Sequence, residues 1–204
     1  MAGNARRKKK TNSTGIKTVA FIAAFAVLAA AAVFFVTRFY EDTRQNIEEL
    51  NYPRDYSEYV EKAASDYSLE PALIYAVIRT ESGFDPDAQS SAGACGIMQM
   101  MPSSFEWLQE KRGMAGEYAT EDLFNPEVCI DYGCYLLKYF YDYYGTERSA
   151  VAAYNAGFVV GDWLADSNYS SDGVNLDSIP YPETSNYVDR VESAKAMYIK
   201  LYYS

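Results

Sequence analysis

A run of twenty residues without a charged side chain limits what this chain can fold into. It extends from Thr18 to Thr37 and reads TVAFIAAFAVLAAAAVFFVT. An α-helix of this length spans about 30 Å, which matches the hydrocarbon core of a bilayer. The run has no polar face, so it does not suit a helix on the surface of a soluble domain. We therefore expect a transmembrane anchor over residues 18–38, preceded by a basic tail at residues 1–17.

The residues around this run predict how the chain is oriented. Basic side chains occupy every position from 6 to 10, and such clusters stay on the cytoplasmic side of a membrane helix. The rest of the chain would then lie outside the membrane, on a charged helical stalk over residues 39–54 that Pro53 interrupts. A cleaved signal peptide, cut within Ala29–Ala32, is the alternative. The apolar run exceeds the usual signal core of about 7–15 residues, which favours an uncleaved anchor.

The charges of the chain are unevenly distributed. Residues 1–40 hold seven basic side chains and no acidic one, so the remainder carries 11 of the 18 basic groups and all 28 acidic ones, a net charge of −17. So acidic a body argues against nucleic-acid binding, and an anionic polymer would have to be held by local contacts. The sequence contains no histidine, which excludes histidine bases, Ser–His triads and histidine metal sites. We expect neither a metal ion nor a cofactor.

Residues 55–204 have the hydrophobic pattern of several short helices. Apolar side chains recur at helical spacing, and proline and glycine mark the segment ends. No alternation predicts a sheet, and residues 113–124 and 166–182 have the composition of loops. The fold class that follows is mainly α, with several short helices around one core. Helices are expected at residues 56–67, 71–82, 105–110, 126–144, 149–155 and 183–203.

The three cysteines are an odd number for an exported domain. Cys129 and Cys134 lie close together on one expected helix, which is an unfavourable geometry for a disulfide. We interpret these two and Cys95 as buried, unpaired side chains. A bond between Cys95 and one of the others is the alternative.

Glu81 is the first candidate for chemistry. It lies in the last turn of the apolar helix at 71–82, where the helix dipole disfavours a further negative charge. Burial would also disfavour the anion, and both effects raise the pKa of a carboxyl group. A carboxylic acid that keeps its proton near neutral pH can donate it to a leaving oxygen. Taken alone, the position favours an ordinary surface carboxylate at a frayed helix end, but the residues that follow change this balance.

A loop of small residues follows Glu81, with the sequence GACG at 93–96, and the segment IMQMMP comes next at 97–102. Small residues let a ligand or another backbone approach closely. Gln99 can donate and accept hydrogen bonds, and Met98 offers a soft apolar contact. Such a loop would suit an amphipathic sugar ring. The alternative is an ordinary turn followed by a core segment.

Four blocks of sequence resemble, in order and spacing, the signature of the soluble lytic transglycosylase domain. They are RTESGF at 79–84, SxxGACGIMQMMP at 90–102, AAYNAG at 152–157 and ETxxYV at 183–188. This family is glycoside hydrolase family 23 and is related to goose-type lysozyme. The resemblance covers residues 55–204, which would form the catalytic domain. Ile97 stands where leucine is usual and Cys95 at a variable position, and neither departure affects the chemistry.

The resemblance implies a lysozyme-like fold and an activity on peptidoglycan glycan strands. Members of the family cut the MurNAc–GlcNAc β-1,4 bond with a single glutamic acid, here Glu81. It acts first as an acid and then as a base on the C6 hydroxyl of MurNAc, which gives a 1,6-anhydromuramoyl end. The N-acetyl group of the substrate assists at the anomeric carbon. The partners are then the glycan strand and, through the N-terminal helix, the bacterial cell membrane, while protein partners are not identified.

The motif match also assigns residues to a substrate cleft around Glu81. It implies that the hydroxyls of Ser90 and Tyr154 lie near the acid and orient it or the N-acetyl group of the substrate. The residues assigned to substrate binding are Ser90, Gly96, Met98, Gln99, Tyr154, Asn155 and Tyr187. Ser82 and Glu183 are weaker candidates, because Ser82 also fits a helix cap and Glu183 a first-turn carboxylate that the dipole favours. For the others, loop and core packing is the alternative role.

Other functions stay open at this point. A hydrolytic muramidase would leave a reducing MurNAc end, and only its products separate it from a transglycosylase. A binding module would have the same fold without cutting, although the intact Glu81 argues against it. A membrane structural protein with a helical outer domain is disfavoured by the four ordered motifs.

Overall fold

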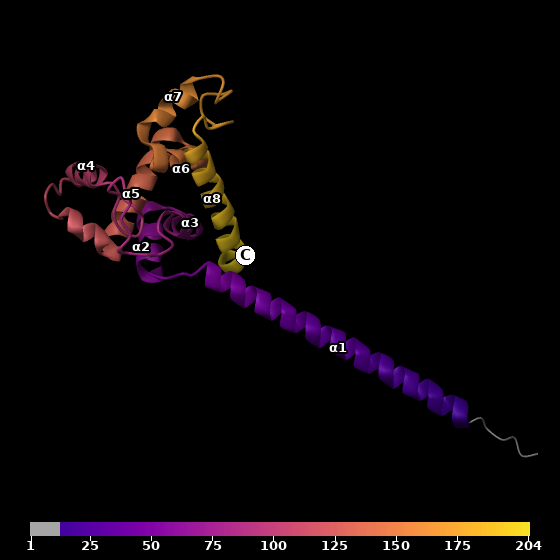
Figure 1. The fold of residues 1–204 in the computed structure, drawn as a ribbon. Coiled ribbons are helices and arrows are strands. Elements are labelled where there is room, and N and C mark those ends of the chain that lie inside the picture. The colour runs from indigo at the N-terminus through magenta and orange to yellow at the C-terminus, as the bar shows by residue number, and fades with distance from the viewer. Residues whose placement is uncertain (1–12) are drawn as a thin grey trace, which may run out of the picture. The chain divides into compact units, whose positions relative to one another are not determined.

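The computed structural model describes residues 13–204, and Figure 1 labels its helices α1 to α8. Most of the expected basic tail, residues 1–12, lies outside the described range. Contacts divide the chain into two units, Met1–Asn51 and Tyr52–Ser204. No strand forms in the described part of the chain, where isolated bridges join Cys95 to Gln89 and to Met100. The expected mainly α fold class is confirmed.

The first unit contains one long helix, α1, from Ser13 to Asn51. It takes in both the uncharged run and the charged segment after it, because neither contains a proline or glycine that would stop a helix. The large apolar side chains of the run are exposed, such as Phe21 at 76% and Phe25 at 69%. Within residues 13–204, Lys17–Asn51 is the helical segment long and apolar enough to cross a membrane.

The second unit contains the remaining helices, and their bounds agree closely with the sequence pattern. Four of them begin at a proline, whose missing N–H is not needed in the first turn. The pattern missed α7 and the short turns at residues 120–124 and 157–159, because segments of three to six residues are too short to show a period. Residues 199–203 lie within the last expected helix and are helical in the structure. The elements are α2 (Ser57–Tyr67), α3 (Pro71–Glu81), α4 (Pro102–Arg112), η1 (Thr120–Phe124), α5 (Pro126–Tyr144), α6 (Glu147–Ala156), η2 (Gly157–Val159), α7 (Val160–Ala165), α8 (Pro182–Tyr198) and η3 (Ile199–Tyr203).

The central helix of the compact unit is α3. Every side chain from Ala72 to Ile78 is at most 2% exposed, so the helix is buried all round and not only along the stripe that the pattern predicted. It packs against α2 and α8, between which it lies in Figure 1. α5 packs against α2 and α6 and completes the core. The end of α3 is therefore held on several sides.

The last residues of the expected stalk belong to the compact unit, which begins at Tyr52. The backbone carbonyls of Tyr52 and Pro53 accept hydrogen bonds from the hydroxyls of Tyr202 and Tyr198. The rings of Tyr52 and Tyr198 also meet edge to face, with 5.5 Å between their centroids. These contacts hold the start of the unit against its C-terminal helix.

The cysteines are free and buried, as expected from the sequence. The Cys129 thiol accepts a hydrogen bond from the Met98 N–H at 3.4 Å, and burial raises the pKa of this thiol to about 11. Cys134 is fully buried, and burial likewise raises its pKa. A thiol in such surroundings stays protonated and behaves as a small apolar side chain.

Candidate active site

Glu81 is the last residue of α3, and its position follows from where that helix stops. Ser82 ends the helix, and the next two residues turn the chain in the left-handed region, with φ of 63° at Gly83 and 73° at Phe84. Such a φ is unfavourable for a bulky residue like Phe84. Its buried ring packs against Tyr75, with 6.4 Å between the centroids, which offsets this strain. The Glu81 carboxyl group is thus placed at the edge of the core.

One hydrogen bond fixes this carboxyl group. The Tyr187 hydroxyl, from α8, donates to Oε1 of Glu81 over 2.7 Å, and Tyr187 is itself only 2% exposed. Burial raises the pKa of Glu81 to about 7, although the Tyr187 bond and the charge of Arg190 both act to lower it. At neutral pH a carboxyl group with this pKa is present in both protonation states. A group that acts first as an acid and then as a base needs both states.

A second tyrosine, Tyr154 of α6, lies close enough to Glu81 for the two to interact electrostatically. Its hydroxyl donates to the backbone carbonyl of Met98 over 2.9 Å. Burial raises the pKa of Tyr154, and the negative charge of Glu81 raises it further. Tyr154 therefore stays a neutral hydrogen-bond donor, and it ties the loop before α4 to α6.

Two serines hold the same loop. The Ser82 hydroxyl donates to the carbonyl of Ile97 over 2.7 Å, which joins the end of α3 to the loop. The Ser90 hydroxyl accepts a hydrogen bond from the N–H of Ala94 at 2.9 Å, across a turn of the loop. Each serine hydroxyl makes a hydrogen bond to the backbone of the loop. The alternative role expected from the sequence, a cap for Ser82 and loop packing for Ser90, is therefore present in the structure.

Gln99 and Gly96 shape the loop further. Gln99 has a φ of 49°, and its Nε2 donates to the carbonyls of Ala88 and Gly96 at 3.0 and 2.9 Å. Gly96 has a φ of 75°, and a Cβ there would lie 1.9 Å from the carbonyl oxygen of Leu123. The backbone that approaches Gly96 closely is thus that of η1, which requires a glycine at this position.

The Met98 side chain lies elsewhere than the sequence suggested. It is 0% exposed and packs against Gly133, where a Cβ would lie 2.5 Å from the Met98 sulfur. A thioether inside the core cannot reach a sugar at the surface. The expectation that the Met98 side chain contacts a sugar is therefore wrong. Met101, at 39% exposure, is the methionine of this segment that lines a groove. An irregular loop has no period from which the sequence could separate the two.

That groove has a volume of about 440 Å³ and opens beside Tyr154. Asn155 lines it and also lines an adjoining hollow of about 480 Å³, together with Glu183 at the start of α8. The Thr184 hydroxyl donates to Oδ1 of Asn155 over 2.8 Å, which joins the AAYNAG and ETxxYV blocks. The structure therefore brings the second pair of motifs together at the surface.

Two aromatic residues of the groove, Trp107 and Phe158, were not expected from the sequence. Both lie outside the four motif blocks, and neither stands in a periodic pattern that would separate it from a core residue. The available signal for Phe158 was an aromatic residue directly after the AAYNAG block. In the structure this side chain is 51% exposed.

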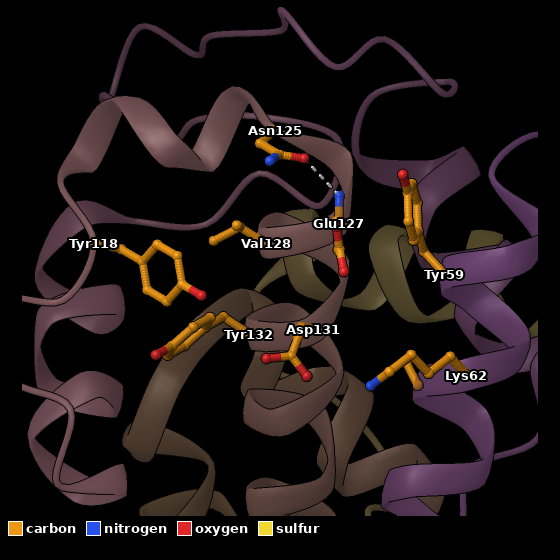
Figure 2. A pocket seen from close by; sticks show the side chains of 9 residues that line it. Tyr59, Lys62, Tyr118, Asn125, Glu127, Val128, Asp131 and Tyr132 are labelled. Carbon is orange, nitrogen blue, oxygen red and sulfur yellow. Dashed lines mark hydrogen bonds between the residues drawn. The ribbon is translucent and has the colours of Figure 1, made fainter.

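A separate hollow of about 310 Å³ lies between α2 and the start of α5, and Figure 2 shows its side chains. None of the expected site residues lines it. Several of its polar groups already have partners: Lys62 pairs with Asp66, and the N–H of Glu127 donates to Asn125, as the dashed line marks. Asp131 accepts bonds from Tyr67 and Arg112. These contacts stabilise the packing of α2, α4 and α5.

Carboxylates near Glu81 in sequence do not join it. Asp85 and Asp87 are exposed, and Asp85 accepts a bond from the backbone N–H of Asp87, as in an ordinary turn. Within residues 13–204, no group of three or more His, Cys, Asp and Glu side chains could hold a metal ion. Glu81, with its raised pKa, is a carboxyl group that can exchange a proton near neutral pH.

Known proteins resemble the compact unit in sequence. The soluble lytic murein transglycosylase of Escherichia coli K12 is 33% identical over 153 residues, which cover 74% of this chain and 24% of that protein. The membrane-bound lytic murein transglycosylase C of Actinobacillus pleuropneumoniae is 29% identical and covers 72% of this chain and 47% of that protein. This chain thus spans about a quarter of the length of the soluble relative.

Solved structures resemble it in fold. An inactive glutamate-to-glutamine mutant of the lytic transglycosylase Slt from Pseudomonas aeruginosa gives a TM-score of 0.67 at 32% identity, over 74% of this chain and 25% of that one. The 70 kDa soluble lytic transglycosylase of Escherichia coli gives 0.67 at 28% identity, over 75% and 25%. The transglycosylase SLT domain family matches residues 58–173, more than half of the sequence. The chain therefore belongs to the transglycosylase SLT domain family.

Proposed function

We propose that this chain is a membrane-anchored lytic transglycosylase that cuts the MurNAc–GlcNAc β-1,4 bond of peptidoglycan. The observation that carries this proposal is the partly buried Glu81, with its hydrogen bond to Tyr187 and a pKa of about 7. Relatives named lytic murein transglycosylases support the substrate. The inactive relative in which a glutamate is replaced by glutamine supports a glutamate as the essential group.

Cleavage begins with protonated Glu81. It gives its proton to the glycosidic oxygen, and the bond between that oxygen and C1 of MurNAc breaks. The GlcNAc part leaves with a free 4-hydroxyl group. The acetamido oxygen of MurNAc stabilises the electron-poor C1, so no second carboxylate is needed. The exposed positions of Asp85 and Asp87 agree with this assignment.

The second step closes a ring within the substrate. The Glu81 carboxylate takes the proton of the C6 hydroxyl of the same MurNAc, and the C6 oxygen bonds to C1. The product is a 1,6-anhydromuramoyl end, Glu81 is protonated again, and no water is consumed. A pKa of about 7 suits both steps, because neither proton transfer is strongly uphill near neutral pH.

The surrounding residues position the acid and the substrate. Tyr187 orients the Glu81 carboxyl group through its hydrogen bond, and Tyr154 holds the loop before α4 through the Met98 carbonyl. Asn155 lines both surface hollows, where sugars of the bound strand would lie. The loop residues Ser82, Ser90, Gly96 and Gln99 act through the backbone that they shape, and Glu183 lines the adjoining hollow.

We propose further that α1 anchors the enzyme with its N-terminus in the cytoplasm and residues 52–204 outside the membrane. The apolar run supplies a helix of sufficient length. The basic residues before it favour this orientation, and a relative named as membrane-bound supports an anchor.

The decisive experiment is mass spectrometry of the muropeptides that the full chain releases from purified peptidoglycan, next to a Glu81→Gln variant. Anhydro-muropeptides from the native chain and none from the variant would support the proposal. Products heavier by one water, with a reducing MurNAc end, would identify a hydrolytic muramidase instead. No release by a folded native chain would favour a binding module.

A further inference from the structure

We infer that Trp107 and Phe158 form a sugar-binding subsite away from the bond that is cut. This inference rests on the proposed function, because it assigns a further length of the same glycan strand to the groove beside Tyr154. Both rings line that groove, although one comes from α4 and the other from the short turn η2. The proposal concerns how strongly a strand is held, and the chemistry at Glu81 is unchanged by it.

The two rings stand at right angles and are held from behind. Their centroids lie 6.0 Å apart with an interplanar angle of 89°. Tyr139 packs against Trp107 at 5.1 Å and Phe140 packs against Phe158 at 5.3 Å, so a second row of rings limits their movement. Phe158 nevertheless remains 51% exposed. A large apolar ring that is both rigid and open to solvent is suited to receiving a ligand at little loss of conformational entropy.

The lining of the groove matches the chemistry of an N-acetylated sugar. A pyranose ring has an apolar face of C–H groups, which packs on an aromatic ring, and a rim of hydroxyl groups. The polar side chains of the groove include the hydroxyls of Ser103 and Ser104 and the amide of Asn155. Because Oδ1 of Asn155 is taken by Thr184, the amide nitrogen is the group left to donate, and an acetamido carbonyl would accept its bond.

Charge and continuity select a peptidoglycan strand as the occupant. The Lys111 ammonium lies 4.8 Å from the centroid of Trp107, which places a positive charge beside the groove in an otherwise acidic unit. MurNAc carries a lactyl group whose carboxylate, free or extended by a peptide, provides negative charge along the strand. The groove also includes Asn155, which accepts a bond from Thr184, and Tyr187 of the same ETxxYV block bonds to Glu81, so the groove and the acid belong to one connected set of residues.

The test is a calorimetric titration of the full-length Glu81→Gln protein in detergent with an octasaccharide of alternating GlcNAc and MurNAc. Adding Phe158→Ala should weaken binding about tenfold, because the stacking ring is lost. Adding Phe158→Tyr keeps the ring and should leave the affinity within about twofold. The matched control is Tyr141→Ala, which removes a 38% exposed ring of α5 that does not line the groove. Equal affinities for the Phe158→Ala and Tyr141→Ala proteins would overturn the inference.

A kinetic readout separates this subsite from the catalytic machinery. In proteins with native Glu81, Phe158→Ala should raise KM for glycan strands about tenfold and leave kcat within about twofold. A fall in kcat with an unchanged KM would overturn the assignment of Phe158 to a remote subsite. Because the titration uses the Glu81→Gln protein, it decides the subsite independently of the products on which the proposed function depends.

Discussion

The Tyr187 hydroxyl reaches the Glu81 carboxyl group over 2.7 Å from a residue that is 106 positions away in the chain. The two residues belong to α8 and α3, so the carboxyl group acquires its partner only when the last long helix packs against the central one. The bond and the burial have opposite effects on the acid. Burial favours the protonated form and the hydrogen bond favours the carboxylate, and the balance is a pKa of about 7.

Replacing Tyr187 with phenylalanine should therefore raise the pKa of Glu81, because the contact that lowers it is removed. The basic limb of the pH profile of kcat/KM should move to higher pH, since Glu81 keeps its proton longer. We also expect about tenfold lower activity at neutral pH, from the loss of a hydrogen bond to a charged group, ~1.5 kcal/mol. Muropeptide release as a function of pH measures both effects.

Tyr75→Phe is the matched control for that change. Tyr75 is also a buried tyrosine, but its hydroxyl has no hydrogen-bond partner among the described residues. The same substitution there should leave the pH profile in place and should not lower activity. A Tyr187→Phe protein with the profile of the native chain would show that the bond to Glu81 does not tune the acid.

Glu81→Gln should stabilise the compact unit at alkaline pH. The raised pKa means that Glu81 favours the folded state below pH 4.5 and that this contribution is lost as the pH rises through about 7. At pH 8 the native carboxylate is ionised in a mostly buried place, at a cost on the order of 3 kcal/mol. Thermal unfolding of both proteins at pH 5 and pH 8 measures this. If the difference in stability between the native protein and Glu81→Gln did not change with pH, this prediction would be wrong.

The full chain should remain in the membrane after washing with alkaline carbonate, because the uncharged run of α1 is long enough to span the bilayer. The mass of the purified protein should also include the basic residues 6–10. A mature protein that begins after Ala29–Ala32, and that washes off the membrane, would show that the run is a cleaved signal peptide.

Most helices and the place of Glu81 could be predicted because they depend on local signals. Prolines mark four helix starts. Gly83, with a φ of 63°, marks the turn just after the helix that carries Glu81. The pairing of Trp107 with Phe158 could not be predicted, because it depends on how α4 and η2 pack. The direction of the Met98 side chain likewise depends on Gly133, which makes room for it in the core.

Gly93 and Gly96 lie in the same loop but differ in the space around them. A Cβ at Gly96 would lie 1.9 Å from the carbonyl oxygen of Leu123, whereas a Cβ at Gly93 would meet no atom within 4 Å. Both have positive φ, so alanine adds about 1 kcal/mol of backbone strain at either position. Gly96→Ala should additionally displace η1 and lower the free energy of unfolding by a further ~2–3 kcal/mol. Denaturant unfolding compares the two, and equal losses would mean that the contact with Leu123 relaxes without cost.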